Sequence, residues 1–78
     1  MAVGQIIKTV TISTKDEGEV RCADLWDLEK KQRYSVKSLS SAFQLKDIVK
    51  FEVEPGQSLW ATVEEKLDSA PAGMTPLL

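Results

Sequence analysis

Apolar and polar residues alternate most clearly between positions 45 and 63. Val49, Phe51 and Val53 are separated by charged residues, which is the period-2 pattern of a strand with one buried face. Turn-forming residues follow at 55–58 (PGQS), and the alternation resumes in 59–63, where Leu59, Ala61 and Val63 share a face. This stretch predicts two strands joined by a turn.

The last of these segments has a second interpretation. Leu59, Val63 and Leu67 are spaced four apart, as on one face of a helix. Ser58 could cap the N-terminus of that helix, and the residues at 64–66 favour helices. A helix over 59–67 therefore stays open beside the strand.

The first apolar segment, 5–13, is rich in β-branched residues and favours a strand. Val10 and Ile12 are expected on its buried face, but Lys8 would then point inward with them. A β-bulge or sharp bend near Lys8 resolves this conflict. After a polar turn at 14–18, Val20 and Cys22 are expected to be buried and Glu19 and Arg21 to face outward.

The middle of the chain predicts another hairpin. Segment 24–32 is interpreted as one helical turn or, preferably, as the far end of a long hairpin with its tip at 27–31. A strand at 33–37 follows, with Tyr34 and Val36 inward. The crossover 38–44 could contain a single helical turn, in which Leu39 and Phe43 lie four apart on one face and could plug the barrel.

These elements predict an all-β fold, a small five-stranded antiparallel barrel of the OB type. We expect one domain over 1–67 and a flexible C-terminal tail over 68–78, where Pro71 and Pro76 interrupt regular structure. At 78 residues the chain has room for one small core.

Composition narrows the chemistry. The net charge of −2 argues against a strongly basic nucleic-acid binder, and the chain has no histidine and one cysteine, Cys22. We interpret Cys22 as a small buried hydrophobe and expect no metal, no cofactor and no enzyme activity, since the clustered carboxylates lie in polar segments. The N-terminus lacks the pattern of a secretory signal and no stretch is long enough to cross a membrane, which indicates a cytoplasmic protein.

The chain resembles the bacterial cold-shock domain, an OB-fold that binds single-stranded RNA and DNA. The likeness is carried by 49–54 (VKFEVE), the turn at Pro55-Gly56, and 60–63 (WATV), with weaker matches at 4–6 and 34–37. The family's first nucleic-acid motif falls on 17–22, where Gly18 alone is retained. Where the family has outward aromatic residues, this chain has Lys8, Ser35 and Lys37, so the aromatic side chains on which bases would stack are missing.

The resemblance implies that the family's binding face carries four cations, interrupted by Glu19: Lys8, Arg21, Arg33 and Lys37. Such a face predicts weak, salt-sensitive binding of single-stranded RNA or DNA; the alternative is a solvated face. A different function is a protein-interaction module, an accessory subunit or a homodimer, that uses Trp26, Trp60 or exposed strand edges.

Overall fold

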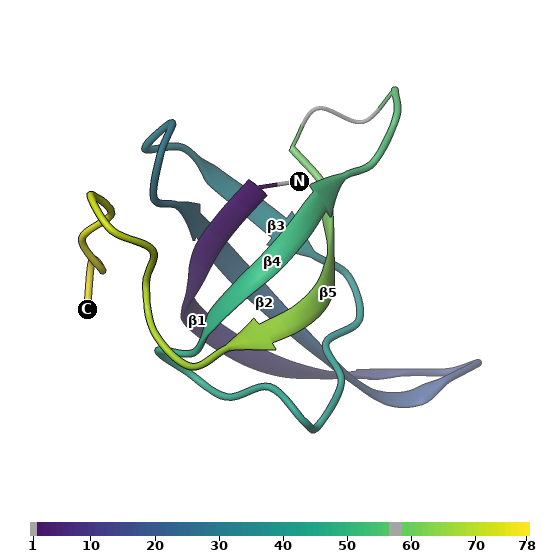
Figure 1. Cartoon of the computed structure of the whole chain (residues 1–78). Helices are drawn as coiled ribbons and strands as arrows, with labels where there is room; N and C mark the ends of the chain where they lie inside the picture. The colour runs from purple at the N-terminus through teal and green to yellow at the C-terminus, as the bar shows by residue number, and fades with distance from the viewer. Residues whose placement is uncertain (1, 57–58) are drawn as a thin grey trace.

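The computed structural model describes residues 2–56 and 59–78 and contains five strands. The strands are β1 (Ala2–Thr14), β2 (Gly18–Asp27), β3 (Arg33–Val36), β4 (Ile48–Val53) and β5 (Ala61–Leu67). They form one antiparallel sheet in the order β3-β2-β1-β4-β5 (Figure 1). The all-β, five-stranded prediction is confirmed, and the helix considered over 59–67 is not formed among the described residues of that segment.

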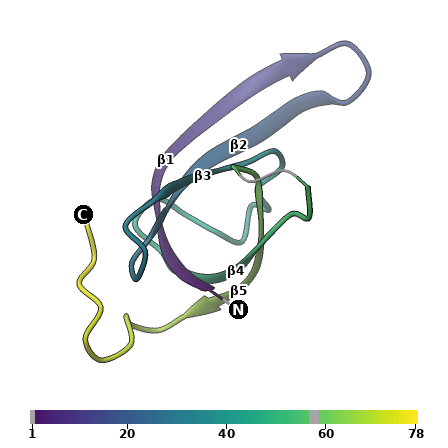
Figure 2. The same ribbon diagram turned by 90° about the horizontal axis from the view of Figure 1, so that it is seen from above.

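The sheet curls until its edge strands meet, as the view in Figure 2 shows. An isolated parallel bridge between Ser35 and Trp60 links the two edges, and in it the Ser35 amide donates to the Leu59 carbonyl at 2.7 Å. In residues 2–56 and 59–78 no continuous ladder joins β3 to β5, so the barrel is partly open.

The core lies inside the curled sheet. Ile6, Leu25, Val49 and Phe51 are fully buried, one from each of β1 and β2 and two from β4. The Phe51 ring packs against the Tyr34 ring with centroids 5.4 Å apart. The predicted inward orientation of Val49, Phe51, Tyr34 and Val36 is confirmed.

The connection between β2 and β3 is a tight hairpin, as preferred from the sequence. The Asp27 side chain is 1% exposed, and its Oδ1 accepts hydrogen bonds from the amides of Glu29 and Lys30, each at 2.9 Å. The Lys31 amide donates a hydrogen bond to the Asp27 carbonyl at 2.8 Å, and Lys31 has a positive φ of 55°. The carboxylate therefore orders the turn from within.

The predicted bulge in β1 is present, but the faces beyond it differ from the prediction. The register moves from Ile6 opposite Leu25 to Lys8 opposite Asp24, so Ile7 is the extra residue. Past this bulge Val10 and Ile12 point outward and are 43% and 46% exposed. The expectation that they lie in the core is wrong, because the inserted residue reverses the phase of the strand.

The assignment of faces on β2 is reversed as well. Ala23 and Leu25 belong to the buried core. Since alternate residues point to opposite faces, Val20 and Cys22 lie on the outer face and Arg21 on the inner one. Cys22 is partly exposed rather than buried.

The remaining segments close the ends of the sheet. Leu39 is buried in the core and Phe43 packs against it, as expected for the crossover, although neither lies in a helix. Leu59, expected to face inward, is 56% exposed. Of the predicted turn at 55–58, Gly56 adopts a positive φ of 75°, while positions 57 and 58, including the proposed Ser58 cap, lie outside the described residues.

Residues 68–78 form no strand or helix, as predicted. Their end returns to the sheet, where the Leu78 amide donates to Oε1 of buried Gln5 at 2.9 Å. Gln5 also donates through Nε2 to the carbonyls of Lys46, at 3.1 Å, and Leu78, at 3.3 Å. Over the described part of the chain, no helix has the length and apolar character needed to cross a membrane.

Candidate binding groove

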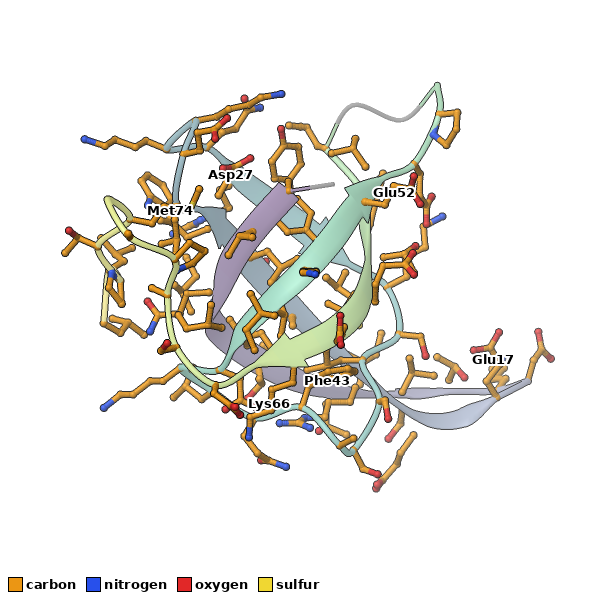
Figure 3. All side chains as sticks on the ribbon, viewed as in Figure 1. Glu17, Asp27, Phe43, Glu52, Lys66 and Met74 are labelled. Atoms are coloured by element: carbon orange, nitrogen blue, oxygen red, sulfur yellow. The ribbon has the colours of Figure 1, made fainter. Side chains whose placement is uncertain are left out.

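A groove lies on the outer face of β1, β2 and β3. We call the part of the β1–β2 hairpin that extends beyond the rest of the sheet, residues 8–22, the arm; Figure 3 shows Glu17 at its tip. The groove has a volume of about 590 Å³ and runs from the arm to Trp60. Its lining residues in the described chain are Lys8, Val10, Ile12, Thr14, Asp16, Glu17, Val20, Cys22, Ala23, Asp24, Ser35, Val36, Lys37 and Trp60.

Strand pairing explains the apolar floor of this groove. In the antiparallel register, Val10 is opposite Cys22 and Ile12 is opposite Val20. Directly opposed residues project from the same face of a sheet, so these four side chains form one apolar patch. Beyond the bulge, this patch faces solvent instead of the core.

Trp60 lies at the opposite end of the groove, where the sheet edges meet. Its partly buried indole ring lies beneath the Lys37 ammonium, which is 5.0 Å from the ring centroid. A cation in this position is attracted to the negative face of the ring. Trp60 therefore gives the groove an aromatic wall with a cation over it.

The charges of the groove are mixed. Lys8 and Lys37 line it together with the carboxylates of Asp16, Glu17 and Asp24. Lys8 is directly opposite Asp24 in the β1–β2 register. Two cations against three anions give the groove no excess of positive charge.

The structure separates the four cations that the resemblance placed on one face. Lys8 and Lys37 line the groove. Arg21 lies on the opposite face of the arm, where its guanidinium donates to the carbonyl of Phe43 and, at 3.4 Å, to Oε1 of Gln44. The grouping is corrected because the reversed phase of β2 turns Arg21 toward the crossover loop.

Arg33 and Trp26 lie elsewhere on the sheet. Arg33 is exposed at the start of β3, and the two residues are opposite each other in the β2–β3 register. Neither lines the groove. The tryptophan that reaches the groove is Trp60.

A second, smaller hollow of about 330 Å³ lies at the other end of the sheet. Asp27, Glu52 and Met74 line it with residues of β1, β4 and the β2–β3 turn, and Figure 3 labels these three side chains. Because Oδ1 of Asp27 is already bonded to two turn amides, we do not assign it a ligand. In residues 2–56 and 59–78, no three His, Cys, Asp or Glu side chains are grouped as a metal site requires.

Sequence reasoning missed Val10, Ile12, Val20 and Cys22 as the floor of the groove because it placed them in the core. Their alternation and the bulge near Lys8 were correctly recognised, but the choice of inner face beyond the bulge was wrong. Comparison with protein-family models, with curated proteins and with solved structures gave no match, so the geometry of the groove is the basis for a functional assignment.

Proposed function

We propose that the chain is a non-catalytic protein-interaction module whose groove binds an extended polypeptide segment. The observation that supports this proposal is the apolar floor of the groove, formed by exposed Val10 and Ile12 and partly exposed Val20 and Cys22. An apolar surface of this kind, bordered by polar and charged residues, is typical of a protein-binding site.

The energetics favour an apolar partner. Val10 and Ile12 are 43% and 46% exposed, so nearly half of each side chain remains to be covered. Covering them would contribute about 1 kcal/mol each, since complete burial of such a side chain contributes about 1.5–3 kcal/mol. Trp60 supplies the kind of aromatic residue that is enriched at binding hot spots.

The charges favour the same class of partner. A polyanion would meet Asp16, Glu17 and Asp24 in the groove as well as Lys8 and Lys37. A polypeptide with residues of both signs can pair with both sets. Mixed charge therefore supports peptide binding over phosphate-backbone binding.

Single-stranded RNA or DNA is the second candidate, for a specific reason. OB barrels bind oligonucleotides on the outer face of their second and third strands, which is where the groove lies. Trp60 could stack one base, and Lys8 and Lys37 could each contact a phosphate. Such binding would be weak and would decline steeply with salt.

One set of variants tests both candidates. Selection from a library of random unstructured peptides should yield ligands whose affinity is lost in Val20→Lys and Trp60→Ala but kept in Thr62→Lys, an exposed β5 variant with the same added charge. Labelled oligo-dT and oligo-U are titrated in parallel at low and moderate salt.

The outcomes separate the candidates. Oligonucleotide binding at low salt that is lost in Lys37→Glu and Trp60→Ala, without any groove-dependent peptide, would replace the first proposal by the second. If neither probe binds in a Trp60-dependent manner, the groove is not a binding site of either kind.

A further inference from the structure

The outer edge of the arm has no strand beside it. β4 pairs with Ala2–Gln5 of β1, and the Ile6 backbone still bonds to the loop before β4 through Asp47 and Lys46. From Lys8 to Thr14, β1 pairs with β2 on one side, and no backbone partner is found on its other side in residues 2–56 and 59–78. Figure 2 shows the arm standing away from the rest of the sheet.

This edge also lacks the features that protect other edges. Residues 9–13 (TVTIS) carry no charge, no proline and no glycine, and four of the five are β-branched. By contrast, β5 carries Glu64, Glu65 and Lys66 in succession. Proteins usually protect exposed edges with charges, prolines or bulges, since the free amides and carbonyls would otherwise pair with another strand.

We propose that this edge pairs in an antiparallel manner with the same edge of a second copy of the chain. The twofold axis that relates the two copies passes between their Thr11 residues. The unpaired stretch runs from Lys8 to Thr14, and Thr11 is its midpoint. Pairing along the whole stretch places Lys8 opposite Thr14 of the second copy and Val10 opposite Ile12 of the second copy. The edge is thus self-complementary in its apolar and polar positions, as an isologous interface requires.

Charges at the two ends of the stretch support the same register. The arm ends in a turn that carries Lys15, Asp16 and Glu17, a net charge of −1, and the unpaired edge ends at Lys8, which is opposite Asp24 and close to the exposed Lys46 beside Ile6. Antiparallel pairing brings the acidic turn of each copy to the basic end of the other. A parallel arrangement would leave these charges apart.

The dimer pairs the backbone edge of β1, whereas the groove opens on the outer face of the arm, so the two proposals use different groups of the same hairpin. A twofold axis perpendicular to the arm keeps the outer faces of both copies on one side of the joined sheet. Val10 and Ile12 of one copy then adjoin Ile12 and Val10 of the other, and the two grooves become neighbours.

The test uses the full chain and a residue at the twofold axis. Thr11 is exposed, and Thr11→Lys or Thr11→Glu each places two like charges directly opposite one another in the dimer. Mass in solution, measured by light scattering during size-exclusion chromatography over a range of concentrations, should show the wild type as a dimer. Each variant alone should bind its own copy more weakly, by up to about fivefold.

Mixing the two variants gives the decisive result. Equal amounts of Thr11→Lys and Thr11→Glu should restore a dimer, because each lysine then meets a glutamate, and the restored dimer should weaken with salt. Thr62→Lys and Trp60→Ala should both dimerise like the wild type, which separates this surface from the groove.

Three outcomes would overturn the proposal. They are a wild type that stays monomeric up to millimolar concentration, a Thr11→Lys variant that dimerises unchanged, and a mixture of variants with no more dimer than either one alone. Loss of peptide binding in Trp60→Ala with the dimer intact would leave the proposal standing and would concern the groove alone.

Discussion

Gly4 occupies a position in β1 where a side chain has no room. A Cβ at this position would lie 2.7 Å from the carbonyl oxygen of Trp26 and 2.8 Å from Cε1 of Phe51. The first of these atoms belongs to the neighbouring strand, and the second belongs to a fully buried ring that packs on Tyr34. We therefore predict that Gly4→Ala destabilises the fold through overpacking.

The expected magnitude follows from two opposing terms. Inserting a methyl group into a well-packed core costs about 1–3 kcal/mol. Replacing glycine by alanine also reduces the entropy of the unfolded chain, which offsets about 0.4–1 kcal/mol of that cost. The net loss is about 1–2 kcal/mol, a large fraction of the stability of so small a domain, and it should lower Tm by roughly 5–15 °C.

Urea denaturation followed by tryptophan fluorescence and circular dichroism measures this loss. A lower midpoint at constant m would show that the native state is destabilised without a change in the surface exposed on unfolding. Gly18→Asn is the control, because Gly18 has a positive φ of 73° that asparagine tolerates, and no atom lies within 4 Å of a Cβ there.

A double-mutant cycle identifies the cause. In a Phe51→Leu background the contact with Cε1 is removed and the contact with the Trp26 carbonyl remains, so the cost of Gly4→Ala should fall without vanishing. The reasoning is refuted if Gly4→Ala stays within about 0.5 kcal/mol of the wild type, or if Phe51→Leu leaves its cost unchanged.

Two further predictions concern side chains that hold loops. Asp27→Ala should lower the free energy of unfolding, measured by urea denaturation, by about 1–3 kcal/mol, because two turn amides lose their acceptor. Asp27→Asn keeps an acceptor oxygen and should lower it by less than half as much. Equal losses in the two variants would assign the effect to the charge instead. Arg21→Gln should speed hydrogen exchange of the amides of Leu39 and Phe43 in the crossover and leave exchange of the Phe51 amide in β4 unchanged. Equal acceleration at the Phe51 amide would mean that Arg21 stabilises the whole fold.

The central strands could be predicted because packing there follows a simple alternation. Val49 and Phe51 face one interior, and charged residues occupy the positions between them, so one choice of face satisfies the pattern. The same holds for Tyr34 and Val36 in β3. A single buried face on a regular strand is information that the sequence carries directly.

The four cations expected on one face could not be grouped correctly from the sequence, for a related reason. The sequence indicates that Arg21 and Lys37 are polar positions in strands, but it does not show which face of a strand meets a loop. The crossover passes beneath the inner face of the arm, where its carbonyls accept hydrogen bonds from Arg21. Loop paths depend on tertiary contacts, so a cation that appears free in the sequence is bonded in the fold.

The bulge at Ile7 links the structure of β1 to both proposals. Ile6 and Val10 are an even number of residues apart, and in a regular strand they would share a face. Ile6 is nevertheless fully buried while Val10 is 43% exposed, because one extra residue lies between them in the register with β2. The bulge therefore lets one strand serve the core at its start and present an apolar surface at its end. Without it, Lys8 would point into the core, and the arm would have no outward apolar face for a partner.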